Sequence, residues 1–587
     1  MKPPLFFILL GSAFLLVAAL ASCGISPGLP PATGTPPLAP GFTPTSAPSG
    51  GSIRGVVVDS AGRPVAGATV RLQATVLSTV ADAEGRFTLT GMQPGRAVRL
   101  TAWASGYYNG GGKDDILPGA TDVKIVLPAH AGADAPGYAW LSAFSSAGYA
   151  GSGENGNCQN CHADPVDPTS DLPFDEWSRD AHAGAARNPR FLSMFLGTDL
   201  AGDQSPLTRY GLDRDYGRIP LRPDPSQPYY GPGYKLDFPD TNGNCAACHA
   251  PAAGVNAPYG TDPAGATAVG AEGVTCDFCH KVWGVHLDQS TGLPSLNMPG
   301  VLSFEFRRPP AGHQFFAGPF DDVAPFEDTY SPIQRQSQFC APCHFGAFWD
   351  TQIYNSFGEW LASPYSEAST GKTCQDCHMP SGKADVFARP DKGGLERDPA
   401  TIVSHLMPGA SSADLLGNAV SMRVSAVREK GSLIVAVTLT NDKAGHDVPT
   451  DSPLRQMILL VSAVDAQGRA LAFLDGPRVP EWGGVGDPAG GDYAGLPGEG
   501  FAKILAELWT DVSPTGAYWN PTRIASDNRL APFQSDVSRY TFALPAEGEA
   551  VVRISLLYRR AFKELMDQKG WDVPDIVMGQ ETIPIGK

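Results

Sequence analysis

The sequence predicts a multidomain chain with an N-terminal β-sandwich, a central region of short helices and loops, and a C-terminal region that is again β-sandwich-like. Two observations predict this division. Residues 52–128 and 420–587 contain alternating apolar runs separated by turn residues, which is the pattern of strands with one buried face. Residues 137–416 are rich in Gly, Pro, Asn and Asp, with few periodic segments, so they make a poor independent core.

Residues 1–22 have the features of a secretory signal, because Lys2 precedes an apolar run that ends in small residues. Their end resembles a bacterial lipobox, in which Cys23 is lipidated and becomes the new N-terminus. If cleavage falls elsewhere nearby, Cys23 is incidental. Residues 23–51 are rich in Pro, Gly, Ser and Thr and predict an extended tether. We therefore expect an exported protein, lipid-anchored to a membrane and facing the periplasm or the cell exterior.

Residues 52–128 begin with strands at 53–59, 70–77 and 86–89, separated by glycine-containing turns. The segments 64–70 and 82–87 resemble the carboxypeptidase regulatory-like domain, which has a transthyretin-type fold. The resemblance implies a β-sandwich that acts as a spacer or an adhesion module. No residues in this region have catalytic spacing.

Five copies of Cys-x-x-Cys-His occupy the central region and use ten of the eleven cysteines. Motifs 1 to 5 are, in order, Cys158, Cys161 and His162; Cys245, Cys248 and His249; Cys276, Cys279 and His280; Cys340, Cys343 and His344; and Cys374, Cys377 and His378. This spacing is typical of c-type haem attachment, where two thiols form thioethers and the histidine binds iron. Redox dithiols and zinc sites also use cysteine pairs, but neither requires histidine after each second cysteine. The sequence therefore predicts five covalently bound c-type haems.

Two pairs of motifs share features that indicate a duplication. Motifs 2 and 3 are close in sequence, as are motifs 4 and 5, and the second motif of each pair follows a Gly-x-Thr lead-in. Coincidence between such short words is the alternative. A duplicated two-haem module predicts close contact between the haems of each pair.

Each haem iron needs a sixth ligand or remains open. Six histidines lie outside the motifs, which is enough for bis-histidine ligation of all five irons. The predicted distal metal ligands are His182, His286, His313, His405 and His446. His130 follows the first sandwich and is expected to be a surface residue of the linker. Methionine ligation, by Met379 or Met407, is secondary because histidine is in sufficient supply.

The C-terminal region predicts strands at 432–439, 457–461 and 551–558, with a long loop at 483–500 and one short helix near 504–508. These features indicate a second sandwich-like domain.

Four segments resemble multihaem cytochromes related to hydroxylamine oxidoreductase and its tetrahaem electron acceptor. They are residues 273–282, 359–380, 177–182 and 445–450. The resemblance implies electron transfer through packed haems, and it implies that His182 is a distal ligand.

The formal net charge of −17 disfavours nucleic acid as a partner. The sequence thus predicts a lipid-anchored pentahaem cytochrome that transfers electrons in extracytoplasmic respiration. Its partner would be a redox protein or a small redox-active molecule, and self-assembly into a longer wire is a further expectation. The alternative is a reductase or oxidase of a small nitrogen or sulfur compound at one open haem. No catalytic residue is assigned, because no motif carries Lys in place of its histidine. Adhesion through the two β regions is the third possibility.

Overall fold

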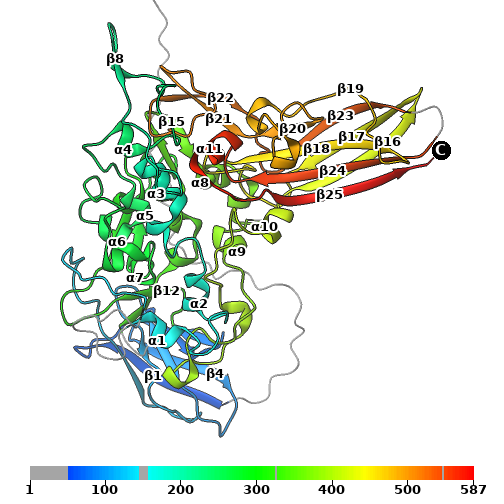
Figure 1. Ribbon diagram of the computed structural model, residues 1–587. Coiled ribbons are helices and arrows are strands. Elements are labelled where there is room, and N and C mark those ends of the chain that lie inside the picture. The colour runs from blue at the N-terminus through cyan, green and yellow to red at the C-terminus, as the bar shows by residue number, and fades with distance from the viewer. Residues whose placement is uncertain (1–50, 145–156, 324–326, 370, 545–547, 587) are drawn as a thin grey trace, which may run out of the picture. The chain divides into compact units, whose positions relative to one another are not determined.

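The computed structural model describes residues 51–144, 157–323, 327–369, 371–544 and 548–586 (Figure 1). The predicted signal, most of the tether, and Cys23 lie outside these residues. Residues Gly50–Lys587 form one compact unit, and the division into three regions stays a prediction. Strands predominate and the helices are short. Within the described ranges, no helix is long and apolar enough to span a bilayer.

Two small sheets make up the N-terminal region. One has the order β4-β1-β7 and the other β3-β2-β5-β6. The strands are β1 (Gly51–Asp59), β2 (Thr69–Leu72), β3 (Ser78–Val80), β4 (Arg86–Met92), β5 (Leu100–Trp103), β6 (Gly110–Gly111) and β7 (Val123–Leu127). Strand β4 alternates between buried and exposed residues, and Phe87 and Leu89 join a core shared by both sheets. Gly55 is required where β1 meets β7, because a Cβ there would lie 2.1 Å from the Val123 carbonyl oxygen.

The central region consists of short helices joined by loops and two-stranded sheets. Its helices are α1 (Cys158–His162), α2 (Pro173–Ser178), α3 (Pro189–Leu196), α4 (Tyr234–Asp237), α5 (Ala246–His249), α6 (Pro251–Gly254), α7 (Cys276–Cys279), α8 (Ser356–Leu361), α9 (Cys374–His378) and α10 (Ala413–Gly417). Its strands pair as β8 (Tyr210–Asp213) with β9 (Gly217–Pro220), β10 (Val282–Val285) with β11 (Phe304–Phe306), β12 (Phe316–Gly318) with β13 (Asp328–Tyr330), and β14 (Gly346–Phe348) with β15 (Thr351–Tyr354).

The lead-in shared by motifs 3 and 5 has a structural reason. Thr275 caps α7 by accepting a hydrogen bond from the Phe278 N–H, and Thr373 caps α9 in the same way through the Asp376 N–H. The Asp376 carboxylate in turn accepts a hydrogen bond from the Thr373 N–H, which completes a capping box. The threonine therefore starts the helical turn that carries each motif.

Two four-stranded sheets pack face to face in the C-terminal region (Figure 1, right-hand side). The first has the order β16-β17-β23-β19, and the second β20-β18-β24-β25. Their strands are β16 (Ser421–Glu429), β17 (Ser432–Thr440), β18 (Gln456–Asp465), β19 (Phe473–Asp475), β20 (Gly498–Phe501), β23 (Ser535–Ala543), β24 (Ala550–Arg559) and β25 (Ile576–Ile585). Inward residues such as Val435 on β17 and Ile554 on β24 belong to one apolar core.

The prediction of a short helix near 504–508 is wrong. The segment forms β21 (Lys503–Glu507), which pairs antiparallel with β22 (Thr522–Asp527). Ile504, Leu505 and Ala506 are all buried there. A short apolar run that is buried on both faces has no periodicity that separates a strand from a helix, so pairing with β22 decides the outcome. The helix of this region, α11 (Lys563–Lys569), lies further along the chain.

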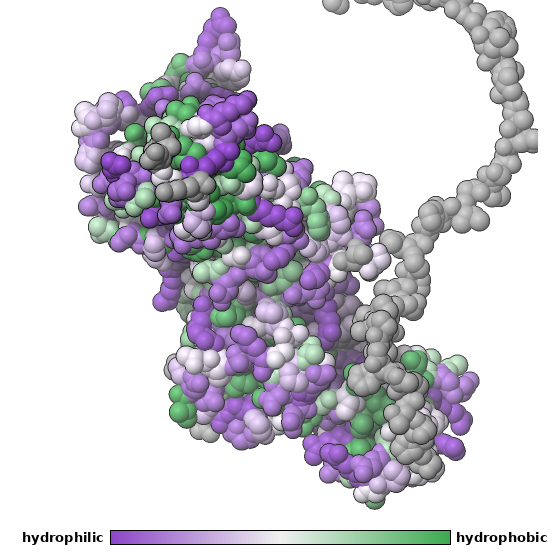
Figure 2. All heavy atoms as spheres, turned by 90° about the vertical axis from the view of Figure 1, so that its right-hand side faces the viewer, coloured by the Kyte–Doolittle hydropathy of each residue, from purple (hydrophilic) through white to green (hydrophobic). Residues whose placement is uncertain are grey.

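On the face shown in Figure 2, hydrophilic residues predominate and apolar residues are scattered among them. Isolated apolar side chains of this kind are ordinary on protein surfaces.

Candidate functional site

Short helical turns present the motif side chains. Motifs 1, 2, 3 and 5 lie on or beside α1, α5, α7 and α9, and motif 4 follows a 3-10 turn at Ser337–Phe339. Residues three apart on a helical turn lie on one side of it, so both thiols of a motif face the same way. The ten described cysteines are all free thiols. Each motif thus offers two adjacent thiols and a histidine.

The thiols of different motifs meet. The Cys158 thiol of motif 1 interacts with that of Cys276 in motif 3, and the Cys340 thiol of motif 4 interacts with that of Cys374 in motif 5. Motif 4 also contacts motif 2, through Cys343 and Cys248. Motif 3 interacts electrostatically with motif 4 through Cys279. The five motifs therefore form one connected cluster in which motif 4 has the most neighbours.

The pairing in space differs in part from the pairing in sequence. Motifs 4 and 5 are in direct contact, as the short spacing between them suggests. Motifs 2 and 3 share an apolar cluster that contains Ala247 and Phe278, but the thiol contact of motif 2 is with motif 4. Whether attached haems touch in the same pairs stays a prediction.

Three of the motif histidines are held in one tautomer. The Nδ1 atoms of His162, His280 and His378 lie 2.6, 2.7 and 2.7 Å from the carbonyl oxygens of Phe387, Ala317 and Pro408. A carbonyl oxygen only accepts, so each Nδ1 carries the hydrogen and Nε2 keeps its lone pair. Metal-bound histidines typically make such a bond with their other nitrogen. These three rings are therefore oriented as metal ligands.

Motif 4 has a different partner. His344 Nδ1 lies 2.9 Å from Asp451 Oδ2. Burial opposes a charged imidazole, but the charge and hydrogen bond of Asp451 raise the pKa of His344 above its usual value. Asp451 was not predicted from the sequence, although it follows the 445–450 element that the sequence singled out. A carboxylate in this position increases the basicity of the ring.

His249 of motif 2 packs against an aromatic side chain. Phe191, on α3, stacks on its ring at a centroid distance of 3.8 Å and an interplanar angle of 5°. Burial lowers the pKa of His249 to about 4, so the ring is neutral at ordinary pH. A neutral imidazole is the form that binds metals.

Two of the predicted distal histidines face a motif histidine. The His182 and His344 ring centroids are 6.4 Å apart, and those of His446 and His378 are 6.3 Å apart. Metal–imidazole bonds are about 2 Å long, and a ring nitrogen lies about 1 Å from its ring centre, so two rings that share one metal have centroids about 6 Å apart. Both pairs have the spacing that one iron between two histidines requires.

The Nδ1 atoms of these two distal rings are also bonded. His182 Nδ1 is 2.7 Å from Asp180 Oδ1, and His446 Nδ1 is 2.9 Å from the Asp447 carbonyl oxygen. Nε2 is therefore the nitrogen left to bind on each ring.

His405 lies between motifs 1 and 3. Burial, followed by the charges of His280 and His162, lowers its pKa to about 4. Glu176, on α2, positions it by accepting hydrogen bonds from the His405 N–H at 2.6 Å and the Ser404 hydroxyl at 2.7 Å. Sequence reasoning missed Glu176, although it directly precedes the 177–182 segment. His405 is placed to serve one of these two motifs.

His286 and His313 have surroundings that assign them to no motif. His286 is exposed, and its backbone N–H donates to the Ser303 carbonyl at 2.8 Å. His313 has a side chain 48% exposed, with Nδ1 2.7 Å from Glu327 Oε1. Their roles as ligands stay predictions.

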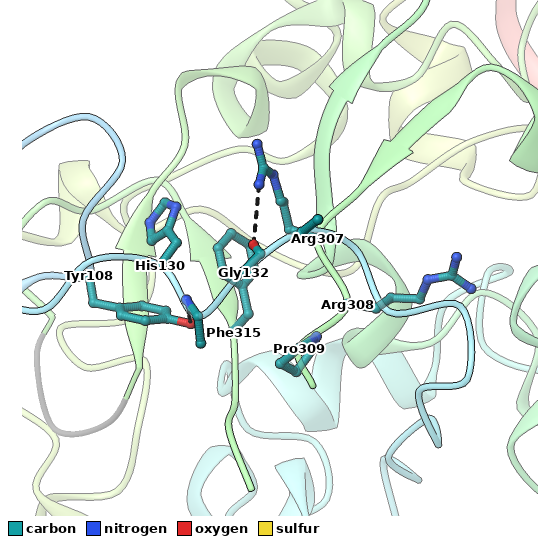
Figure 3. A pocket seen from close by; sticks show the side chains of 9 residues that line it. Tyr108, His130, Gly132, Arg307, Arg308, Pro309 and Phe315 are labelled. Carbon is teal, nitrogen blue, oxygen red and sulfur yellow. Dashed lines mark hydrogen bonds between the residues drawn. The ribbon is translucent and has the colours of Figure 1, made fainter. Parts of the chain in front are cut away.

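His130 is not a surface residue of the linker, contrary to the expectation. Its ring packs at 5.0, 5.3 and 5.2 Å from those of Tyr108, Trp283 and Phe315. Burial lowers its pKa. Figure 3 shows it in a small pocket that Arg307 borders through a hydrogen bond to the Gly132 carbonyl. Trp283 on β10 and Phe315, directly before β12, enclose it, and its flanking sequence carries no sign of this.

A c-type haem fits the motif residues on these observations. They supply paired free thiols, imidazoles with a free Nε2, and two opposing ring pairs at the required spacing.

Comparisons with known proteins place one region firmly. Residues 52–126 match the family model of the carboxypeptidase regulatory-like domain, so the prediction for this region is confirmed. A search of curated proteins found no match.

Solved structures similar to this chain are distant. A penta-heme cytochrome c552 from Thermochromatium tepidum is 20% identical, with a TM-score of 0.48, over 73% of this chain and 97% of its own. The human F-spondin reeler domain is 13% identical, with a TM-score of 0.12, over 29% of this chain and 89% of its own. Outside residues 52–126 no family is assigned, and the chemistry of the five motifs follows from their own residues.

Proposed function

We propose that this protein transfers electrons through five c-type haems attached to motifs 1 to 5. The observation that carries the proposal is the connected cluster, in which each motif thiol set lies against that of another motif. Cofactors attached so close together suit electron transfer between them. A bound c-type haem supplies one-electron iron chemistry.

The side chains of this protein would set the properties of each iron. Carbonyl bonds to Nδ1 fix the rings of motifs 1, 3 and 5, and Asp451 makes the ring of motif 4 the more basic. His182 would complete the coordination of motif 4, and His446 that of motif 5. Ligand basicity and burial are established means of tuning haem potentials. Different surroundings at the five motifs would therefore give five different potentials.

We further propose export and anchoring through a lipid on Cys23, in extracytoplasmic respiration. The basic start, the apolar run and the tether of residues 23–51 support this proposal. The redox partner would be a protein or a small redox-active molecule, and the net charge of −17 favours a basic or neutral one.

Stepwise reduction of the matured protein tests the proposal. A potentiometric titration followed in the visible spectrum should resolve several one-electron steps that together account for five haems. A protein that carries no haem, or whose haems exchange no electrons with a dissolved mediator, would contradict it. Carbon monoxide binding by one reduced haem would favour the reductase alternative, because that chemistry needs an open iron.

A further inference from the structure

Three arginines gather beside motif 2. Arg190 begins the first turn of α3, directly before the Phe191 ring that stacks on His249. Arg455 precedes β18 and Arg560 follows β24. Burial and the charges of Arg560 and Arg455 lower the pKa of Arg190, which shows that the three groups interact.

Two of these charges lie at the same end of one strand pair. Gln456 on β18 pairs with Arg559 on β24, and Arg455 and Arg560 lie directly outside this last pair. Burial, followed by the charge of Arg455, lowers the pKa of Arg560, as expected of like charges that repel. A negative charge bound beside them would relieve this repulsion.

No carboxylate of the described residues supplies that charge within 4.0 Å of any of the three guanidinium groups. Asp451 is the nearby acid, but its oxygens already accept from His344 Nδ1 and from the Ser356 N–H. Arg455 donates to the Thr450 carbonyl at 3.0 Å, whereas the buried Arg560 Nε has no partner in the described structure. Burial opposes the charge of Arg455, but Tyr558 and the Asp451 carboxylate raise its pKa above the usual value, so Asp451 compensates this residue. Among the described residues, no carboxylate interacts with Arg190 or Arg560 in the same way.

Tyrosines line the same place and connect it to motif 2. Tyr558 interacts electrostatically with both Arg455 and Arg560. Tyr354 interacts with Arg455 and with the two motif 2 thiols, and its hydroxyl bonds that of Tyr518. The cluster therefore offers guanidinium and phenol donors next to one attachment site.

We propose that Arg190, Arg455 and Arg560 form a binding site for a carboxylate-like oxyanion beside motif 2. Guanidinium groups bind planar oxyanions through paired hydrogen bonds. The anion has two sources with this chemistry: the propionate groups of a haem on motif 2, or a small oxyanion from solution. Only the first source rests on the proposed function.

The test uses the full-length, haem-loaded protein. Three single variants are compared: Arg455→Gln and Arg560→Gln beside the sheet, and Arg190→Gln on α3. Arg553→Gln is the matched control, because Arg553 lies on the same strand β24 with an exposed side chain. The first readout is the melting temperature. If an anion is bound, each cluster variant melts below the control. If none is bound, losing one of two repelling charges leaves the melting temperature unchanged or raises it, and that result overturns the proposal.

Two further readouts identify the source of the anion. If the anion is a propionate, loss of the positive charge lowers the midpoint potential of one haem. The expected shift is a tenfold change in the ratio of oxidised to reduced haem, which is about 59 mV for one electron. For a small oxyanion, calorimetric titration with nitrite or sulfite shows binding that weakens at least tenfold in the variants. A lower melting temperature with neither change also overturns the proposal, since packing alone explains it. If the chain carries no haem, the proposed function fails, while the nitrite and sulfite titration still tests the arginine site.

Discussion

The central region and the C-terminal sandwich bury their apolar side chains in different ways. The sandwich has strands of nine and ten residues, such as β17 and β24, and both sheets contribute to one large apolar core. The central region has helices of four to eight residues, and its apolar side chains form several small clusters. Cys279 and Cys343 of the motifs pack against one of these clusters, and Cys276 packs against another.

This difference indicates where the stability of each region comes from. The sandwich buries its apolar residues against one another, so its own sequence is sufficient for a core. Short helices are marginal alone, and small apolar clusters contribute little against the entropy of ordering long loops. We therefore expect the stability of the central region to depend on what its motifs bind.

Removing the attachment thiols of motif 4 should have the largest effect. In a Cys340→Ala, Cys343→Ala variant, the cluster loses its connection to motifs 2, 3 and 5, so residues 157–416 should become protease-sensitive. The sandwich should stay resistant, because its core does not use the motifs. Limited proteolysis with mass spectrometry of the fragments measures both. Among the described thiols of the other motifs, only those of motif 4 interact with the thiols of motif 5. A Cys374→Ala, Cys377→Ala variant should therefore make less of the chain sensitive to protease. Equal sensitivity of the sandwich would contradict the comparison.

Loss of the ring opposite motif 5 should open one iron. His446→Ala removes the partner at 6.3 Å from His378, so the reduced protein should bind about one equivalent of carbon monoxide more than the parent. The shift of the visible spectrum on adding the gas measures this. Lys443→Ala, at an exposed side chain three positions before His446 that is not a predicted ligand, is the control. A variant that binds no additional gas would remove His446 from the ligand set.

Weakening the carboxylate behind motif 4 should change a potential and leave the fold intact. Asp451→Asn replaces a charged acceptor with a neutral one, so His344 becomes a poorer donor to ferric iron and the midpoint of one haem should rise. Spectroelectrochemical titration measures the shift against Asp215→Asn, an exposed control. An unchanged set of midpoints would mean that Asp451 has no influence on the iron.

The smallest effect should be confined to the sandwich. Burial, followed by the charge and hydrogen bond of Asp536, raises the pKa of Glu499 from 4.5 to about 7. The folded state then binds a proton more tightly than the unfolded state, so stability is full below pH 4.5 and falls as the pH rises to about 7. Denaturant unfolding at a series of pH values measures the slope. Glu499→Gln should flatten it, and Glu429→Gln, at an exposed carboxylate on β16, should not.

The sequence predicted the regular parts of this molecule best. Strands β17, β18 and β24 follow from apolar runs bounded by turn residues, and the match of residues 52–126 follows from two short segments. The apolar run at 504–508 misled because both of its faces are buried, which removes the periodicity that a prediction needs.

The candidate site was predictable in its residues but not in its pairings. The motif spacing identifies the attachment thiols, and the 177–182 and 445–450 segments identify His182 and His446. Which motif each of these rings faces depends on contacts between residues more than sixty positions apart, such as His182 with His344. Asp451, Glu176 and the arginine cluster also arise from tertiary packing alone, so no local pattern announces them.

The most direct test is the haem content of the matured, full-length protein, measured as the pyridine haemochrome per chain together with the dithionite-reduced visible spectrum. We expect five c-type haems per chain, retained after denaturation because they are attached through thioethers. A chain without the c-type α-band, or one that loses its haem on denaturation, would contradict the assignment of all five motifs.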